Sequence, residues 1–402
     1  IQFAYGVSAG GYLSSPGNKI ILDQLFVSAR WRKLRLDLGM IQPEEEYNGV
    51  SSTNGDFVRS GNSRTFPGYN LRSDFIDIPG TKGIIAFQFN WADYMMTDNS
   101  YVKDIRLHNK SLYVKITPHR RWEIIAGLEH WAQWAGKHPT LGKQPGSFSD
   151  YGRIIFADGG GAGATTSDSI NALGNHLGRE HLRINYLADN YILSFYHDIP
   201  FEDGSGTDFR SFPDGTYCFY YGSKNPQQWI SDGIYEFYYT KYQSGSRHDR
   251  PATPEEIAKQ DPNSHFYGRK VLGGCDNYFN NGEYANGWTL YEQVIGSPFM
   301  TPGLSDNLTR IINNRIIGHH VGIKGMAWQT TPYKLLLSYS KNYGTYGNKF
   351  NKDQFSGALE VTLPFHKLPF TIEIGLYSDL GKLFKDNFGF TIKLNRKGKL
   401  IK

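Results

Sequence analysis

The chain has 402 residues, of which 43 are Lys or Arg and 38 are Asp or Glu, giving a formal net charge of +5. Basic and acidic residues are interspersed, which argues against a nucleic-acid-binding surface, and no apolar stretch reaches the ~18 residues that a membrane-spanning helix needs. The 27 Tyr and 25 Phe occur in a chain whose mean hydropathy is only −0.49. This combination suits strands that face lipid on one side and water on the other.

The chain opens at Ile1 directly into an alternating stretch, with no initiator Met and no signal peptide. We expect it to be a processed or partial product of a secreted protein, with some native N-terminal residues missing. The two cysteines, Cys218 and Cys275, have no metal-like spacing. A disulfide between them is permitted in an oxidising compartment, but we favour unpaired thiols.

Apolar and polar residues alternate in several segments along the chain. In the first, Leu34, Leu36 and Leu38 alternate with Arg35 and Asp37. Successive side chains of a strand point to opposite faces, so each segment predicts a strand with one apolar and one polar face. The clearest segments are 34–40, 112–117, 235–240, 372–376 and 387–394.

The connections between these segments are of two kinds. Tight polar turns are predicted at 117–120, 187–190, 329–332 and 364–369, and long Gly- and Asn-rich loops at 43–80, 135–178, 246–287 and 297–312. Short turns on one side and long loops on the other are typical of outer-membrane barrels. We therefore predict an all-β fold, a single transmembrane antiparallel β-barrel over residues 1–402 with about 16 to 18 strands, whose lumen is plugged by loops. A soluble β-sandwich or propeller is the rival, and the absence of a repeat of about 40 residues disfavours the propeller.

No motif points to catalysis, a cofactor or a metal. The glycine-rich run 159–164 lacks the Gly-Lys-Ser/Thr ending of a phosphate loop. Glu202 and Asp203 are adjacent and read as a turn, and His319 and His320 point to opposite faces of a strand, so they cannot chelate one ion together. We expect a protein that is not an enzyme.

One group of residues suits carbohydrate, because aromatic rings stack on sugar faces while amides and carboxylates hydrogen-bond to hydroxyls. Two alternatives stand beside this interpretation: an aromatic girdle at the membrane interface for the rings, and turn chemistry for the amides. The candidate carbohydrate-binding residues are Trp131, Trp134, Asp276, Asn277, Tyr278, Asn281, Trp288 and Tyr291.

A series of short pieces in the middle of the chain resembles the Wzi-like capsule-assembly family, in the version found in Bacteroidota. No single piece is specific, and the match rests on their order and spacing between residues 170 and 320. The pieces are Gly174–Gly178, Leu182–Ile184, Phe201–Gly206, Asp232–Glu236, Thr240–Lys241, Gln243–Gly245, Gly273–Gly274, Asp276–Tyr278, Asn280–Gly282, Gly287–Thr289, Ile295–Gly296 with Pro298, and Asn313–Arg315.

The resemblance implies a monomeric, plugged barrel of about 18 strands in the Gram-negative outer membrane, acting as a surface lectin in capsule assembly. Expected partners are capsular or other surface polysaccharide, outer-membrane lipid and lipopolysaccharide, and other outer-membrane proteins. The alternative is a porin-type channel for small solutes or oligosaccharides, with Arg and Lys residues of the polar faces lining the pore. Loops longer than the usual 12–15 or so residues favour the plugged barrel, because they can fold inward.

Overall fold

A computed structural model describes residues 1–14, 17–160, 172–202, 211–248, 250–259, 274–365, 368 and 370–395. The largest sheet has 17 strands. They are β1 (Gln2–Ser14), β2 (Gly17–Trp31), β3 (Leu34–Met40), β4 (Gly68–Ser73), β5 (Ile76–Asp77), β6 (Ile85–Met95), β7 (Arg106–His119), β8 (Trp122–Trp134), β11 (Asn175–Leu187), β12 (Tyr191–Phe201), β13 (Gly215–Ser223), β14 (Asp232–Tyr239), β19 (Ile316–Ala327), β20 (Thr331–Gly344), β21 (Lys349–Leu363), β22 (Thr371–Gly381) and β23 (Asn387–Asn395).

The other elements lie in the connections between these strands. They are η1 (Tyr47–Gly49), α1 (Phe148–Phe156), α3 (Pro254–Lys259) and three small hairpins, β9 (Lys137–His138) with β10 (Gly142–Lys143), β15 (Thr289–Leu290) with β16 (Gln293–Val294), and β17 (Thr301–Ser305) with β18 (Leu308–Asn313). None of the described helices is long and apolar enough to cross a membrane.

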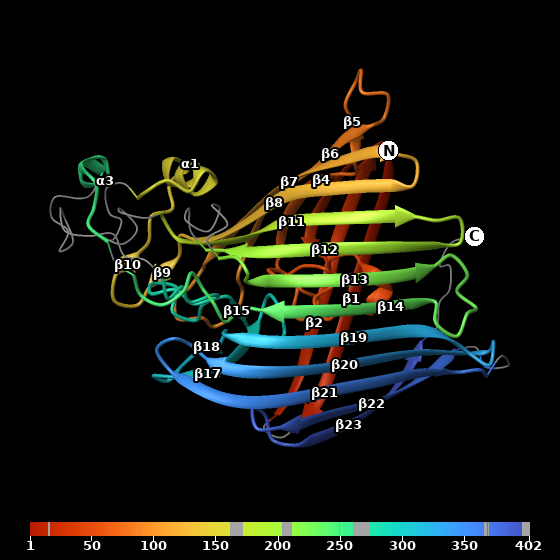
Figure 1. The fold of residues 1–402 in the computed structure, drawn as a ribbon. Helices are drawn as coiled ribbons and strands as arrows, with labels where there is room; N and C mark the ends of the chain where they lie inside the picture. Colours follow the sequence, from red (N-terminus) through yellow and green to blue (C-terminus); the bar gives the residue numbers. More distant parts are fainter. Residues whose placement is uncertain are drawn as a thin grey trace.

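The 17 strands form one curved wall in which all neighbours are antiparallel (Figure 1). β14 pairs directly with β19, so the described residues between these two strands lie outside the wall sheet. β1 pairs with β2 and β23 with β22, and within the part of the chain that the structure describes no pairing joins β1 to β23. The predicted all-β antiparallel fold and its strand number are confirmed.

The wall has an apolar outer face and a polar inner face. On β7, Leu112, Val114 and Ile116 are 54%, 36% and 40% exposed, although they are apolar, because they point away from the lumen. Their neighbours point inward. Four exposed Trp residues lie at the short-turn ends of the strands, where an interfacial girdle is expected: Trp31, Trp122, Trp229 and Trp328.

All four predicted long loops contain more structure than the sequence suggested; α3, for example, lies in the predicted loop 246–287. Residues 68–73 of the predicted loop 43–80 form β4, and the β17–β18 hairpin (residues 301–313) takes up most of the predicted loop 297–312 and extends one residue beyond it. The sequence did not predict that hairpin because Pro302 and Gly303, which usually indicate a turn, lie within β17. In the predicted loop 135–178, helix α1 begins after Ser147, whose hydroxyl and Asp150 form a capping box.

The lumen is plugged, as predicted, by two segments that fold inward and share an apolar core. Phe57, Val58 and Phe66 from the inner loop (residues 41–67) pack against Trp288 and Ile295, which belong to the second segment. We call that segment the upper loop (residues 276–300). Hydrogen bonds join the two loops, among them Trp288 Nε1–H to the carbonyl of Val58 at 2.7 Å and the Ser297 amide to Phe57 at 2.9 Å. In the part of the chain that the structure describes, the wall therefore encloses a packed hydrophobic core to which both loops contribute.

Candidate functional site

The inner loop is fixed to the inner face of the wall by polar contacts on β14 and β19. Glu236 accepts hydrogen bonds from the Ser51 hydroxyl at 2.6 Å and the Ser52 amide at 2.9 Å. His320 Nε2 lies 2.9 Å from the carbonyl oxygen of Val50. His319 points the other way, toward Tyr235 on the outer face, so the prediction that the two histidines face opposite sides is confirmed.

Three strands away in the sheet from β14, Arg179 of β11 is the centre of a buried charge cluster. Its guanidinium nitrogens lie 3.3 Å from Asp56 of the inner loop, 3.0 Å from Glu129 of β8 and 2.8 Å from Asp198 of β12. His181 Nδ1 contacts the second oxygen of Asp198 at 2.6 Å. Burial of a charge is tolerated only when the charge is paired and hydrogen-bonded. Arg179 meets that condition through its three carboxylate partners, one from the inner loop and two from the wall.

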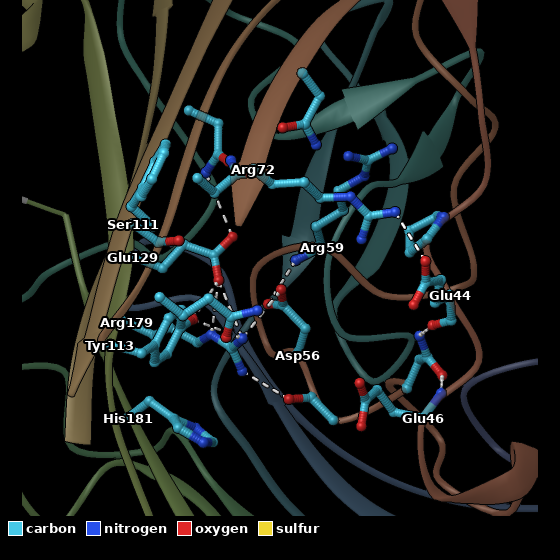
Figure 2. Close-up of a pocket in the computed structure, with 18 of the residues that line it drawn as sticks. Glu44, Glu46, Asp56, Arg59, Arg72, Ser111, Tyr113, Glu129, Arg179 and His181 are labelled. Atoms are coloured by element: carbon cyan, nitrogen blue, oxygen red, sulfur yellow. Dashed lines mark hydrogen bonds and ion pairs between the residues drawn. The ribbon is translucent and has the colours of Figure 1, made fainter. Parts of the chain in front are cut away.

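A polar cavity of about 310 Å³ lies between the inner loop and the wall strands β3, β4, β6, β7, β8 and β11. Figure 2 shows acidic and basic side chains around it, with Glu44 and Asp56 from the inner loop facing Arg72 and Arg179 from the wall. Arg72 forms ion pairs with Asp37 at 3.3 Å and Glu44 at 2.8 Å. The cavity can hydrogen-bond a polar ligand, whereas no group of described residues has the composition and geometry to hold a metal ion.

Arg59 differs from the other arginines of this cavity. Its guanidinium lies over three aromatic rings, at 5.2 Å from Phe66, 5.4 Å from Tyr94 and 5.5 Å from Trp131. Within the described chain it forms no ion pair with a carboxylate. A cation held by ring faces keeps its charge available to a ligand.

Inside the inner loop, burial raises the pKa of Asp56 from its usual 3.8 to about 7, although Arg179 opposes the shift. Asp214, in the loop before β13, also has its pKa raised by burial, to about 6. It accepts hydrogen bonds from the amides of Tyr242 and Gln243 and from the Tyr278 hydroxyl. Both carboxyl groups therefore titrate near neutral pH.

A second polar surface lies at the long-loop rim, where β14 ends and β19 and β21 begin. Arg315 lies over the ring of Tyr346 at 4.0 Å, and Lys241 over the ring of Tyr343 at 4.2 Å. Lys349 is 5.9 Å from the Tyr346 ring. We call these five residues the basic–tyrosine cluster; none of its three cations has a carboxylate partner in the described parts of the chain.

The structure separates the eight predicted carbohydrate-binding residues by exposure. Trp131, Tyr278 and Trp288 are at most 1% exposed and belong to the lumen core. The Trp131 indole donates to Glu129 at 2.8 Å. Trp134 is 4% exposed and stacks on Tyr151 of α1. These four rings present no free face in this structure, because protein covers them.

The remaining four predicted residues lie in or beside the upper loop, nearer the surface. Asp276 accepts a hydrogen bond from Ser244, and Asn277 from Asn314, so their side chains hold the loop. Asn281 accepts from two backbone amides of its own turn. Tyr291 is 37% exposed, with the Arg64 guanidinium 3.8 Å from its ring centre. Carbohydrate contact at these eight residues stays a prediction.

Other sequence predictions have plain outcomes. Cys218 and Cys275 are both free thiols, as favoured. Glu202 accepts a hydrogen bond from the amide of Phe279, while Asp203 and most of 159–164 lie outside the described residues. The sequence analysis missed Arg179; the alternating Arg179, His181 and Arg183 on one strand face were the available signal.

Comparison with known proteins supports the fold. The chain superposes on Wzi of Escherichia coli, an outer-membrane protein involved in group 1 capsule assembly and a carbohydrate-binding β-barrel, with a TM-score of 0.52 and 12% identity over 92% of this chain and 68% of that one. OpdL of Pseudomonas aeruginosa matches with a TM-score of 0.45 and 12% identity (99% and 88% covered), and OprD of the same organism with 0.42 and 11% (98% and 83%). No protein-family profile matches the sequence, and no curated protein matches it. The chain has the fold of an outer-membrane β-barrel.

Proposed function

We propose that this chain is a Gram-negative outer-membrane protein that binds polysaccharide at the cell surface and takes part in capsule assembly or attachment. The plugged lumen carries the proposal. An apolar core shared by the inner and upper loops fills the space through which a solute would pass, so the molecule is better suited to holding a ligand than to transporting one. Its likeness in fold to Escherichia coli Wzi agrees with this function.

The basic–tyrosine cluster is the part of the long-loop rim that we assign to the glycan. Tyrosine rings stack on the apolar faces of sugars, and unpaired cations attract carboxylate groups. The cluster therefore suits an acidic polysaccharide. Tyr291 and Asn277 add an exposed ring and an exposed amide on the upper loop. Tyr278 and Trp288 of the same loop are buried in the lumen core with Trp131 of β8.

The test is to measure binding of a soluble polyuronate, with neutral dextran as the comparison polymer, to the purified protein. We expect Lys241→Gln, Arg315→Gln and Lys349→Gln together to weaken polyuronate binding by at least about tenfold, since each site is weak and retention comes from many contacts. The matched control replaces three exposed cations of the short-turn side, Arg32, Lys82 and Arg120, by Gln. If both triple variants bind the polyuronate equally, the basic–tyrosine cluster is not the glycan-binding site.

A porin-type channel remains the second candidate, and one observation favours it. The cavity of about 310 Å³ is lined by facing acidic and basic side chains, an arrangement that can orient a small polar solute. Conductance in a planar bilayer separates the two functions, because a plugged barrel passes little current and a porin passes a large, steady one.

A further inference from the structure

The cavity of about 310 Å³ beside the inner loop extends along the inside of the wall from the short-turn side to the packed core. Phe75, between β4 and β5 on the short-turn side, lines one end, and Trp131 of the core lines the other. Glu44 and Glu46 also line it (Figure 2), with side chains 65% and 56% exposed. Glu44 contacts Arg35, near the short-turn end of β3, at 2.7 Å. These exposed acids therefore mark the entrance, which faces the short-turn side.

The acidic groups that line this cavity already have arginine partners. Each of the five carboxylates in the described lining lies within 3.8 Å of an arginine other than Arg59. A ligand ammonium group would therefore have to compete with a guanidinium for every one of these carboxylates, which disfavours cationic and zwitterionic ligands. The pairs are Asp37 and Glu44 with Arg72, Glu46 with Arg183, and Asp56 and Glu129 with Arg179.

Arg59 is the arginine of this lining that has no carboxylate partner in the described chain. Its guanidinium lies over the rings of Phe66, Tyr94 and Trp131. Its side chain makes one polar contact with the described residues, in which Nη1–H donates to the Tyr94 hydroxyl at 3.4 Å. Guanidinium groups bind carboxylates through strong, charge-assisted hydrogen bonds. The charge of Arg59 is thus available to an anionic ligand inside the cavity.

Two neutral polar groups line the wall on the short-turn side of Arg59. They are the Ser111 hydroxyl and the side-chain oxygen of Asn90, and neither has a hydrogen-bond partner among the described residues. Ser111 and Asn90 lie directly opposite each other on β7 and β6. Ser111 is two residues along β7 from Asn109, which lies opposite Trp131. The neutral groups therefore begin about 7 Å along the strand from the level of the Trp131 ring, a spacing that suits a ligand the size of one sugar.

We propose that this cavity binds a free sugar acid of monosaccharide size, with its carboxylate at Arg59 and its hydroxyls at Ser111 and Asn90. Sugar hydroxyls donate and accept hydrogen bonds, which suits hydroxyl and amide side chains. At about 310 Å³ the cavity lies at the lower end of the usual range of about 300–1,000 Å³ for ligand sites. The inference does not rest on polysaccharide binding at the long-loop rim.

The experiment measures binding of D-glucuronate, D-glucose and L-alanine to the purified full chain in detergent by calorimetry. We expect glucuronate to bind at least tenfold more tightly than glucose, which lacks the carboxylate, and than alanine, whose ammonium group meets only paired acids. Arg59→Gln should lower glucuronate affinity at least tenfold, and Arg59→Lys, which keeps the charge, should retain most of it. The matched control is Arg64→Gln, because Arg64 belongs to the same loop and lies over the Tyr291 ring at 3.8 Å but does not line the cavity. It should change glucuronate affinity less than twofold.

A second variant tests the neutral half of the site. Ser111→Ala should weaken glucuronate binding severalfold, since it removes one hydrogen bond and no charge. Heat-dependent migration on gels verifies that each variant retains the folded barrel. The proposal is overturned if glucuronate does not bind, if glucose or alanine binds as tightly, or if folded Arg59→Gln binds glucuronate normally. Unchanged polyuronate binding by Arg59→Gln, and unchanged glucuronate binding by the Lys241/Arg315/Lys349 variant, keep this result separate from the proposed function.

Discussion

Arg179 joins the inner loop to the barrel wall through three carboxylates at 3.3 Å or less. Replacing it by Met leaves Asp56, Glu129 and Asp198 close together with no cation between them. Breaking a buried ionic cluster by removing one partner costs about 3–5 kcal/mol, and we expect the free energy of unfolding in urea to fall by that amount. Arg121→Gln is the control: it breaks an exposed pair with Asp189 and should cost less than about 1 kcal/mol. If both variants lose a similar free energy of unfolding, the buried cluster does not stabilise the fold more than an exposed ion pair does.

The raised pKa values of Asp56 and Asp214 predict how stability depends on pH. A carboxyl group whose pKa is higher in the folded than in the unfolded protein stabilises the fold while protonated. Its contribution is complete below the ordinary value of 3.8 and is lost as the pH rises through about 7 for Asp56 and about 6 for Asp214. We therefore expect the urea midpoint to fall between about pH 4 and pH 7, and Asp56→Asn to reduce that fall. If the urea midpoint of Asp56→Asn depends on pH as that of the unchanged protein does, the raised pKa of Asp56 is contradicted.

At the scale of elements, the sequence predicted the wall better than the plug. Alternation of Leu112, Val114 and Ile116 with polar residues is a local signal, and the structure places these side chains on the outer face as expected. The contact between Arg179 and Asp56 joins residues 123 positions apart, since their numbers differ by that amount, and no local pattern encodes it.

The same reason explains why the exposure of the candidate site could not be predicted. Alternation along β8 puts Trp131 and Glu129 on the lumen side, but only the inward fold of two distant loops determines that the lumen is filled. A tryptophan expected to stack on sugar is therefore enclosed by Phe66, Tyr94 and Trp288. The basic–tyrosine cluster escaped notice because its members lie at the ends of four strands, β14, β19, β20 and β21.

The plug should loosen without loss of the barrel when its central tryptophan is removed. Trp288 is fully buried, and its indole N–H donates a hydrogen bond to the Val58 carbonyl of the inner loop. We therefore expect Trp288→Ala to destabilise the packed loops by about 3–5 kcal/mol. We expect faster proteolytic cleavage within residues 41–67 while the β signal in circular dichroism stays constant. Trp328→Ala, at a side chain 73% exposed in a short turn, should leave cleavage unchanged. Equal cleavage of both variants would show that the loops do not depend on each other.

At the scale of the whole molecule, the long loops occupy different positions. The inner and upper loops close the lumen, whereas the segment after β8 carries α1 to the outside of the wall. A barrel of this width cannot be filled by its own strand side chains, so its permeability depends on which loop is present. Loop length alone does not identify the plug.

The final prediction concerns conductance, and it separates these loops by deletion. The intact protein should conduct poorly in a planar bilayer, because the packed core of the inner and upper loops occupies the lumen. Replacing residues 51–62 by a short Gly-Ser linker removes Phe57, Val58 and the Ser51 and Ser52 anchors to Glu236, and should raise conductance severalfold. Replacing residues 140–170 should leave conductance low, because α1 covers the outer face and not the lumen. A large current from the intact protein would favour the channel, and a current that rises only in the second variant would place the plug after β8.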